Sequence, residues 1–479
     1  MLSRVARFLW KAVKWTFLVV VTLFALLVLI NGRDEDLSDE ARALLEAKPV
    51  EVPDNENIFV AMAGVNTPEG SDIFEAGRRH IEKAKKELEQ KDKSLEEQEK
   101  REVLRWKKAV LPFDCSFDKE ADFLECARSQ KERLEKTLAA NETLVRRYLL
   151  LQELPHYVAP QNPNVWFAAG GYSAMAYVWR HLAAQAFLDI ESGNTEAGLA
   201  FFRKDLTFWR RHLEGKSFLV DSMVATSQMT RNAYRLSLLL SSPSINVEKQ
   251  APEWRELLAP LSREQARMRP AIEGEIRFVY GLLPAWKKWV SYQEATEQPY
   301  RFCFFIKPGA EACSAWQWWL DRNGQALFFQ PNATLNYYVP FYKTWLKLTD
   351  LSWKDYIEQR DEALAPLVAL SEPGVGWIYN PVGKRQSHSL IYVWDEYVGR
   401  LYDLGTYLRM VRLQLELRLA KIPSEEIPAF IEQLDEAYCA PCSDFSWDTE
   451  TRTLSFQPYN EKAFTRHAST SVYVPDVRE

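Results

Sequence analysis

An uninterrupted apolar stretch, Phe17–Ile30, constrains the fold of this chain more than any other feature. Its fourteen residues carry no charge, and extending it back to Ala12 gives nineteen residues that are interrupted only by Lys14. Because a helix rises 1.5 Å per residue, a segment of this length spans a hydrocarbon core of roughly 30 Å. The sequence therefore predicts one transmembrane helix, with Phe17–Ile30 as the part that contacts the membrane.

The charges on either side of this stretch predict its orientation. Arg33 follows it and is itself followed at once by three acids. Four basic residues precede it, namely Arg4, Arg7, Lys11 and Lys14. Basic residues next to a transmembrane helix are retained on the cytoplasmic side. We therefore expect a short cytoplasmic N-terminus, with everything after Asn31 on the far side of the membrane.

A cleaved signal peptide is the alternative, since it also combines a basic start with an apolar centre. No small-residue cleavage site of the A-x-A type follows Ile30, where the sequence reads Asn-Gly-Arg-Asp. The sequence therefore favours a retained anchor over a removed leader.

The length and the charge of the chain limit what the part outside the membrane can do. The 479 residues leave enough length for one large domain or for two to three ordinary ones. The formal net charge is −6, and the four basic residues before the apolar stretch contribute +4 of it, which leaves −10 for the remainder. Negative charge opposes contact with nucleic acid or with an anionic lipid surface. We expect neither as the main partner.

Six cysteines predict disulfide bonds. They form three pairs that are close in sequence: Cys115 and Cys126, Cys303 and Cys313, and Cys439 and Cys442. Fifteen pairings are open to six cysteines, and we expect the local one because each pair lies far from the next and beside loop-forming residues. An even number of cysteines fits an oxidising compartment such as the periplasm.

The last pair, Cys439-Ala-Pro-Cys442, also matches the C-x-x-C motif of thiol oxidoreductases. A redox site needs its first cysteine at the start of a helix, which lowers the pKa of the thiol. Here the motif follows a helical pattern and precedes the loop-like Ser443–Ser446, so that a structural bridge is favoured over a catalytic pair. A zinc site would need two further ligands, and none stands nearby in the sequence.

Hydrophobic periodicity predicts a mainly helical, all-α fold, an irregular array of helical hairpins with a small C-terminal β-hairpin. The clearest helices are Tyr172–Ser192, Thr195–Leu213 and Phe218–Leu240, because turn residues separate them. Near the end of the chain, Phe445–Phe456 alternates as a hairpin does, with its turn at Asp448–Thr451.

We expect five parts along the chain. They are a cytoplasmic tail and transmembrane helix (1–31), a linker (32–72), a charged helical arm with a local disulfide (73–154), a main helical domain with aromatic-rich loops (155–385), and C-terminal helices with the C-x-x-C loop and the hairpin (386–479). In the arm, fourteen of the twenty residues of Lys83–Glu102 are charged, and both signs are mixed. A solvated helix is the favoured interpretation, and a helix that docks on a partner is the alternative.

Three stretches carry a resemblance to known proteins: Gly70–Ala84, Cys115–Cys126, and patches of the C-terminal part between Leu408 and Asn460. In these stretches the chain resembles a family of uncharacterised bacterial membrane-anchored proteins. The resemblance implies an envelope location and a largely helical fold. It implies no activity, cofactor or catalytic residue.

Motifs of common enzymes are missing from the sequence. It has no phosphate-binding loop, dinucleotide-binding glycine motif, zinc-protease motif, serine-hydrolase elbow or EF-hand loop. One S-x-x-K match, Ser116–Lys119, lies inside the first cysteine pair and lacks its partner motifs. The six histidines are dispersed, with no pair four residues apart that would suit a metal. We expect no cofactor and no metal site, and a non-enzymatic role is favoured while an activity is left open.

Aromatic residues gather between Tyr300 and Tyr338, and the carboxylates Glu294 and Asp321 lie near this belt. Rings that stack on sugars and carboxylates that transfer protons suit glycan binding or cleavage. Burial of the rings in a helical core is the favoured alternative. Glu294 and Asp321 are the two candidate catalytic residues.

Three hypotheses of function follow. The leading one is a single-pass inner-membrane protein whose periplasmic helical domain binds a protein partner as a scaffold component of the cell envelope, with Lys83–Glu102 as the feature that suggests the partner. The second is an anchored glycan-binding or glycan-cleaving protein. The third is a tethered chaperone or immunity protein.

Overall fold

The structure, a computed structural model, describes residues 2–46, 50–89, 104–106, 115, 120–160, 171–292, 323–324, 327–385, 387–433 and 445–475. The predicted all-α class is confirmed, since 71% of the described residues are helical and the described strands form a small sheet near the C-terminus.

The chain divides into two compact units, which are described separately. Unit 1 contains residues 1–48 and 276–394, and unit 2 contains residues 49–275 and 395–479. The divisions at 276 and 394 fall within two long helices, α12 (Arg269–Tyr292) and α17 (Ser387–Ala420).

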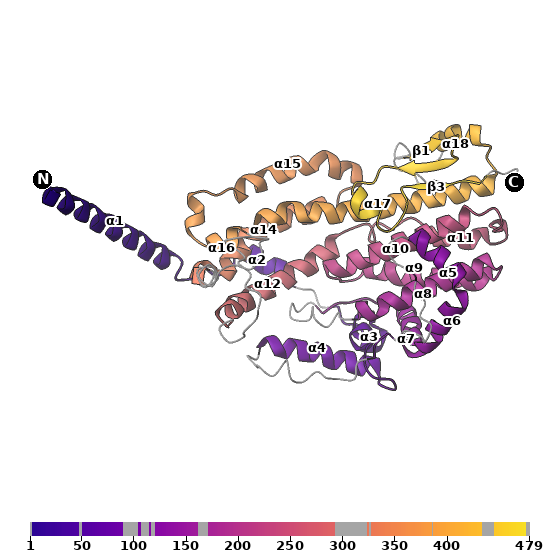
Figure 1. Cartoon of the computed structure of the whole chain (residues 1–479), viewed down its shortest axis with the longest axis horizontal. Helices are drawn as coiled ribbons and strands as arrows, with labels where there is room; N and C mark the ends of the chain where they lie inside the picture. The colour runs from indigo at the N-terminus through magenta and orange to yellow at the C-terminus, as the bar shows by residue number, and fades with distance from the viewer. Residues whose placement is uncertain are drawn as a thin grey trace. The chain divides into compact units, whose positions relative to one another are not determined.

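Unit 1 begins with the apolar helix α1 (Leu2–Ile30; Figure 1). Its segment Trp10–Ile30 is long and apolar enough to cross a membrane, with a mean hydropathy of 2.5, and it is not buried inside the protein. The prediction of an apolar helix of membrane-spanning length is therefore confirmed.

The remainder of unit 1 is built around α14. Its elements are α2 (Asp39–Leu45), α14 (Pro331–Leu348), α15 (Trp353–Ser371), the short 3-10 helix η6 (Val375–Ile378) and α16 (Pro381–Arg385). Helix α14 starts with Pro331, whose fixed φ suits the first position of a helix. It buries Tyr342 and Trp345 and packs against both α2 and α15. Helix α15 starts after Ser352, whose Oγ accepts a hydrogen bond of 3.2 Å from the N–H of Asp355.

Three successive helices form the centre of unit 2 and lie side by side (Figure 1). They are α8 (Tyr172–Glu191), α9 (Thr195–Glu214) and α10 (Leu219–Leu240), and their bounds agree with the predicted ranges to within one residue. Gly193 separates α8 from α9 with a φ of +93°, a conformation that costs glycine little. Trp209 of α9 is fully buried.

The other elements of unit 2 precede and follow this centre. They are η1 (Asp54–Glu56), α3 (Ile58–Gly64), α4 (Ile73–Glu89), α5 (Glu120–Ser129), α6 (Lys131–Ala140), α7 (Glu142–Glu153), η4 (Glu248–Gln250), α11 (Ala251–Leu257), η7 (Ser424–Glu426), α18 (Ile427–Gln433), β1 (Phe445–Asp448), β2 (Thr453–Phe456), α19 (Glu461–Phe464) and β3 (Ser471–Tyr473).

Residues 32–72, expected to form a linker, contain helices, and all seven residues of α3 are buried. Helix α4 crosses α3 so closely that only glycine fits at the contact. A Cβ on Gly64 would lie 1.9 Å from the carbonyl oxygen of Ile73, and a Cβ on Gly77 would lie 1.9 Å from that of Val60. The missing side chains therefore let the two backbones pack together.

The predicted C-terminal hairpin is confirmed. Strands β1 and β2 are antiparallel, with Phe445 opposite Phe456. Leu454 and Phe456 are buried while their neighbours in β2 are half-buried, as the alternation predicted. Strand β3, which was not predicted, pairs with the other edge of β2.

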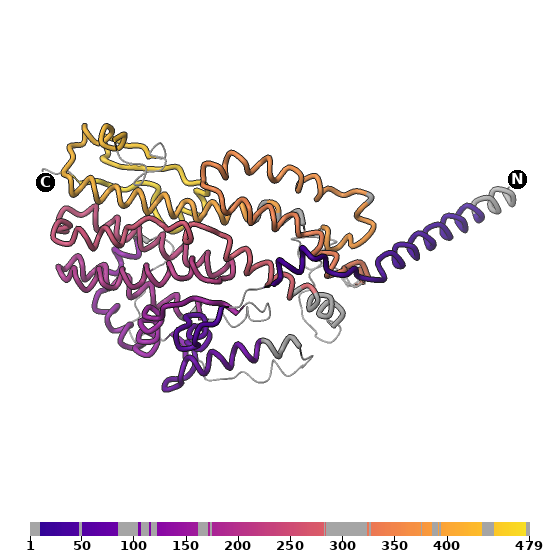
Figure 2. The backbone as a smooth tube through the Cα atoms, turned by 180° about the vertical axis from the view of Figure 1, so that it is seen from behind, coloured from indigo at the N-terminus to yellow at the C-terminus, as the bar shows by residue number. Residues whose placement is uncertain are grey.

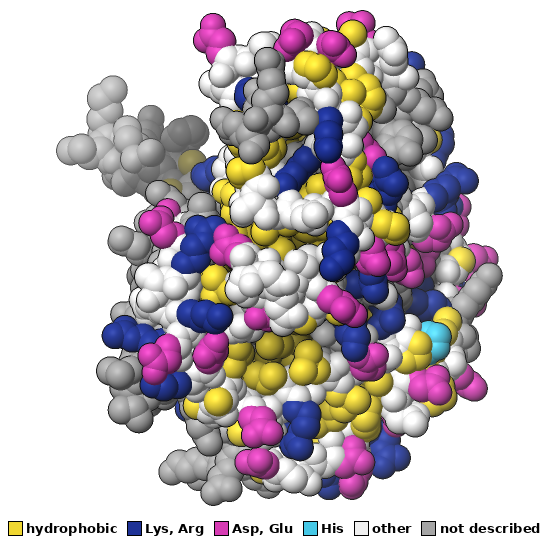
Figure 3. All heavy atoms as spheres, turned by 90° about the vertical axis from the view of Figure 1, so that its right-hand side faces the viewer, with side chains coloured by type: hydrophobic (Ala, Val, Ile, Leu, Met, Phe, Trp, Pro, Cys, Tyr) yellow, Lys and Arg dark blue, Asp and Glu magenta, His cyan; other side chains and the backbone are white. Residues whose placement is uncertain are grey.

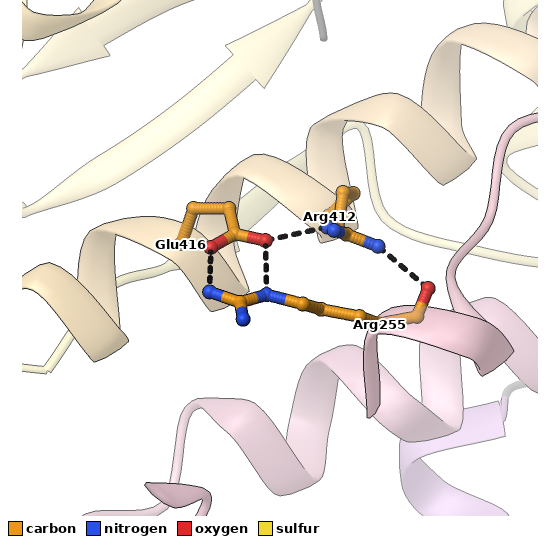
Figure 4. A network of polar contacts seen from close by, with 3 residues as sticks. All are labelled: Arg255, Arg412 and Glu416. Atoms are coloured by element: carbon orange, nitrogen blue, oxygen red, sulfur yellow. Dashed lines mark hydrogen bonds and ion pairs between the residues drawn. The ribbon is translucent and has the colours of Figure 1, made fainter. Parts of the chain in front are cut away.

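A network of charged side chains joins α11 to α17 within unit 2 (Figure 4). The carboxylate of Glu416 accepts hydrogen bonds from Nε and a terminal nitrogen of Arg255, at 3.1 and 2.9 Å, and from Nε of Arg412 at 2.7 Å. Burial acts to raise the pKa of Glu416, but the hydrogen bonds and charges of the two arginines outweigh it, and this pKa lies below its ordinary value. The bidentate pairing suits a structural contact.

Candidate functional site

The two candidate catalytic carboxylates, Glu294 and Asp321, lie outside the described residues, as does most of the aromatic belt. Four of the cysteines also lie outside them, namely Cys303, Cys313, Cys439 and Cys442. These predictions stay predictions. The first predicted bridge is present, since Cys115 and Cys126 are joined by a disulfide bond.

Asn31, the first residue after α1, is bound into unit 1 by both ends of its side chain. It is 1% exposed. Its Nδ2 donates to the backbone oxygens of Leu27 and Ile378, both at 2.9 Å. Its Oδ1 accepts a hydrogen bond of 2.8 Å from the backbone N–H of Asn380, and its backbone oxygen accepts one from the side chain of Gln330. The chain is thus held at the residue where the apolar helix ends.

Asn380 is the centre of this network, and it is fully buried. Its φ is +52°, a conformation that asparagine adopts more readily than most other residues. Its Oδ1 accepts from the backbone N–H of Gln330 at 3.0 Å and of Gly383 at 3.3 Å, and its Nδ2 donates to the hydroxyl of Thr334 at 2.9 Å. One side chain therefore connects the starts of α14 and α16.

Asp34 caps α14 although 298 positions separate it from Asn332, the second residue of that helix. Its two carboxylate oxygens accept from the backbone N–H groups of Asn332 at 2.9 Å and Ala333 at 3.1 Å. These N–H groups have no partner within the helix, and a negative charge is favourable at a helix N-terminus. One turn further on, Asn336 accepts from the backbone N–H of Ser38 at 2.9 Å.

We call Asn31, Asp34, Gln330, Asn336 and Asn380 the α1 clasp. The path of the chain from α1 into these contacts can be followed in Figure 2. Each hydrogen bond adds only about 0.5–1.5 kcal/mol net, but leaving such buried groups without partners costs about 1–3 kcal/mol each. The segment after α1 is therefore a structural part of unit 1.

Unit 2 contains a small pocket between α10, α17 and the region of α19. It is lined by Met223, Thr226, Ser227, Thr230, Arg400, Asp403, Ala463, Phe464 and His467. The spacing of the four residues from α10 places them on one face of that helix, because residues three and four apart are neighbours on a helix surface.

Ser227 and His467 meet in this pocket, with 3.3 Å between Oγ and Nε2. Burial lowers the pKa of His467 to about 4, and the positive charges of several arginines act in the same direction. These arginines are Arg231, Arg400, Arg180 and Arg466. The imidazole is therefore neutral at pH 7 and lies in a region of positive potential.

Asp403 lines the pocket and also fixes the chain segment at Tyr459 and Asn460. It is 1% exposed, and its carboxylate accepts from the backbone N–H groups of Tyr459 at 2.7 Å and Asn460 at 3.0 Å. Burial raises the pKa of Asp403 to about 6, and the two hydrogen bonds limit the rise. Asp403 thus fixes the segment that leads into α19 and on to His467.

The contact between Ser227 and His467 resembles that of a nucleophile and its general base. The other features of a catalytic pair are not found among the described residues. A catalytic histidine needs a partner that orients its second nitrogen and a pKa near the working pH. Nδ1 of His467 has no hydrogen-bond partner among the described residues, and its low pKa makes it a weak base. Among the described residues, the pair of Ser227 and His467 therefore has no third group that orients the imidazole.

A second polar cluster surrounds Asp221 at the start of α10. Asp221 accepts from the backbone N–H of Phe218 at 2.8 Å and from the hydroxyl of Tyr172 at 2.9 Å, and that hydroxyl lies 3.3 Å from the hydroxyl of Tyr157. Burial raises the pKa of Asp221 to about 6 and that of nearby Glu275 to about 7. The contact with Phe218 closes the first turn of α10, which is a structural role.

No group of three or more His, Cys, Asp or Glu side chains that suits a metal ion occurs in the part of the chain that the structure describes. No protein-family model matches the chain. No curated protein matches it, and no solved structure does.

Proposed function

We propose that this chain is a single-pass protein of the bacterial inner membrane, anchored by α1, and that its periplasmic helical domain is a binding or scaffold component of the cell envelope. The observation that carries the proposal is the burial of Asn31 in the α1 clasp, directly after a helix that is long and apolar enough to span a membrane.

The clasp supports a retained anchor over a cleaved leader. Cleavage after Ile30 would place a charged α-ammonium group on Asn31, which is 1% exposed, and burial of an unpaired charge is costly. Cleavage after Gly32 would remove Asn31 and leave the buried N–H of Asn380 and the amide of Gln330 without the partners they have now. In either case the hydrogen bonds or the burial of Asn31 that stabilise unit 1 would be lost.

Two further observations support a periplasmic location for the bulk of the chain. The basic residues stand before α1 and the acids directly after it, which is the distribution expected of a cytoplasmic N-terminus. The Cys115–Cys126 bond is of the kind that persists in an oxidising compartment.

The charges favour a protein partner over nucleic acid. The negative charge of the part after α1 opposes nucleic acid. On the face shown in Figure 3, basic and acidic side chains are interspersed, as they are on a surface that is solvated or binds protein. The charged arm Lys83–Glu102, whose first residues belong to α4, is the proposed partner-binding segment.

Fusions to the two ends of the chain test the topology. We expect a periplasm-dependent alkaline phosphatase to be active when it follows Glu479, and a fluorescent protein that requires the cytosol to fluoresce when it precedes Met1. The exchanged fusions serve as controls and should be silent. A fluorescent C-terminal fusion would place the bulk of the chain in the cytosol and overturn the proposal.

Copurification tests the binding role. The wild-type chain is compared with a variant in which residues 90–102 are replaced by a Gly/Ser segment of equal length. The control variant replaces Glu358 and Glu362, exposed acids of α15, by serine. We expect a partner that is retained by the wild type and by the control and lost with the arm. A chain that is monomeric and partner-free at its native level removes the basis of the scaffold role.

A further inference from the structure

Apolar side chains of unit 1 lie beside the end of α1 and are open to the surroundings. We propose that Leu327, Phe328 and Ile378, which we call the apolar patch, enter the membrane leaflet in which α1 ends, so that unit 1 makes a second contact with lipid. This proposal rests on the proposed role of α1 as a retained anchor. It adds a surface of the folded unit that an anchor alone does not require.

Exposure of the patch is the first observation. Leu327 is 41% exposed and Ile378 is 43% exposed, while Phe328 is half-buried. Leu29 and Ile30, in the last turn of α1, are exposed as well. A single exposed apolar residue is ordinary on a protein surface, but several of them beside a helix of membrane-spanning length indicate an interaction site.

Two contacts fix the depth of the patch relative to α1. The backbone oxygen of Ile378 accepts a hydrogen bond of 2.9 Å from Nδ2 of Asn31, which directly follows the helix. The ring of Phe328 meets that of Phe24 edge to face, with 6.5 Å between the ring centroids. Phe24 precedes Ile30 by six positions, which is about 9 Å along a helix. Ile378 therefore lies at the level of the end of α1, and Phe328 lies deeper along it.

This depth selects lipid as the occupant of the patch. Phe24 belongs to the apolar stretch Phe17–Ile30, so that a ring beside it faces hydrocarbon when α1 spans the membrane. Apolar side chains of proteins that lie on a membrane reach about 5–10 Å into the boundary between headgroups and acyl chains. The depth of Phe328 falls in this range. A soluble partner would have to insert itself between the patch and the bilayer.

Tyr379 suits the level of the lipid headgroups. Its hydroxyl donates to the backbone oxygen of Arg33 at 3.2 Å, and Nζ of Lys384 lies 5.8 Å from the centre of its ring. Tyrosine is enriched at membrane–water interfaces, and lysine extends its amino group to water there while its aliphatic part stays in apolar surroundings. Three acids follow Arg33 and oppose anionic headgroups. The contact therefore depends on apolar burial and not on the charge of the lipid.

Spin-label accessibility on the full chain in lipid nanodiscs tests the proposal. A spin-labelled amino acid, introduced by codon suppression so that the cysteines stay intact, replaces Leu327 or Ile378. Oxygen concentrates in hydrocarbon, whereas a nickel chelate stays in water. We expect the ratio of oxygen to nickel collisions at both positions to be several-fold higher than at the control position Ile357. The ratio at Leu327 should exceed that at Ile378, because Leu327 adjoins the deeper Phe328.

Ile357 is a matched control because it is also an isoleucine of unit 1 and is 41% exposed. It precedes Ser371, the last residue of α15, by fourteen positions, which is about 21 Å along the helix. The chain then continues from Ser371 to the patch residue Ile378. The control therefore shares the residue type and the exposure of Ile378 but not its position beside α1.

A label in place of Val21 separates this proposal from the proposed anchor. Val21 is an exposed residue of the apolar stretch and should give the highest ratio of all. A high ratio at Val21, with ratios at Leu327 and Ile378 equal to that at Ile357, would overturn the lipid contact and leave the anchor intact. A low ratio at Val21 would contradict the anchor and the lipid contact together. Patch labels shielded from both reagents would show that protein covers the patch, which also overturns the proposal.

Photocrosslinking of the wild-type chain gives the same information without a substitution. The nanodiscs contain a lipid with a diazirine in its acyl chain, and mass spectrometry locates the adducts. We expect adducts in α1 and at Leu327, Phe328 or Ile378, and none in the first two turns of α15, which include Ile357. Adducts confined to α1 would overturn the proposal, and so would adducts that are as frequent around Ile357 as at the patch.

Discussion

The side chain of Asn31 and the backbone N–H of Asn380 are joined by a hydrogen bond of 2.8 Å across 349 positions of the chain. Asn31 directly follows the apolar helix, and Asn380 connects the starts of α14 and α16 through Gln330 and Gly383. The end of α1 is therefore part of the folding unit that follows it. A substitution of either asparagine should therefore affect both the end of α1 and the remainder of unit 1.

Asn380→Ala should destabilise unit 1 by about 2–4 kcal/mol. The change leaves the buried N–H of Gln330 without its partner and puts alanine at a φ of +52°, and each effect costs about 1–3 kcal/mol. Urea unfolding followed by tryptophan fluorescence measures the difference from wild type.

Asn380→Gly separates the two causes. Glycine adopts the positive φ without strain but also lacks the hydrogen bonds. We expect it to be more stable than Asn380→Ala and still less stable than wild type. If it equals wild type, the side chain of Asn380 does not hold the clasp together.

Gly77→Ala should destabilise unit 2 by about 1–3 kcal/mol, because the new methyl group would lie 1.9 Å from the backbone oxygen of Val60 and would force α4 away from α3. Gly374→Ala is the matched control, since a Cβ at that position meets no atom within 4 Å, and it should be nearly neutral. Thermal unfolding of both variants distinguishes them. Equal effects of the two changes would show that the contact between α3 and α4 is not tight.

The pKa of Asp221 predicts how its contribution to stability depends on pH. Burial raises this pKa from 3.8 to about 6, so that the folded protein binds more protons than the unfolded chain between these pH values. The stability contributed by this group is present below about pH 4 and is lost as pH rises through 6. At 1.36 kcal/mol per pKa unit, the loss is about 3 kcal/mol.

Asp221→Asn lacks this titration. The free energy of unfolding of the wild type minus that of the variant should fall by about 3 kcal/mol between pH 4 and pH 7, as measured by urea unfolding at a series of pH values. Groups that titrate alike in both proteins cancel in the difference, whereas Glu275 contributes in the same direction because the charge of Asp221 helps to raise its pKa. A difference that is constant with pH would mean that Asp221 is not buried as described.

Removal of the Cys115–Cys126 bridge by the double change to serine should lower the free energy of unfolding by about 3 kcal/mol, since the bridge closes a loop with a sequence separation of 11. Urea unfolding of the wild type under oxidising conditions and of the double variant measures it. A double variant as stable as the wild type would show that the bridge does not constrain the unfolded chain.

Local patterns predicted the elements that depend on neighbouring residues. Helices α8 to α10 have apolar residues at helical spacing and turn residues between them, and the hairpin at Phe445–Phe456 follows from alternation around one turn. Helix α3 was missed because Ile58–Gly64 is a short apolar run, and such a run fits a strand as well as a helix. Its burial depends on Gly77 in another helix.

Neither the clasp nor the pocket could be predicted from the sequence, because their residues lie far apart in it. Ser227 and His467 are separated by 240 positions, and Asp34 and Asn332 by 298. Asparagine and aspartate are also common in exposed turns, so that the presence of these residue types directly after an apolar segment does not predict that they are buried. Only the packing of the helices brings these side chains together.

The mass of the intact chain extracted from washed membranes tests the central claim most directly. If α1 is a retained anchor that the clasp joins to unit 1, the protein carries the whole N-terminal segment, including the apolar stretch Phe17–Ile30 and Asn31. A mature chain that begins near Arg33 would show that the helix is removed, and it would contradict both the anchor and the clasp.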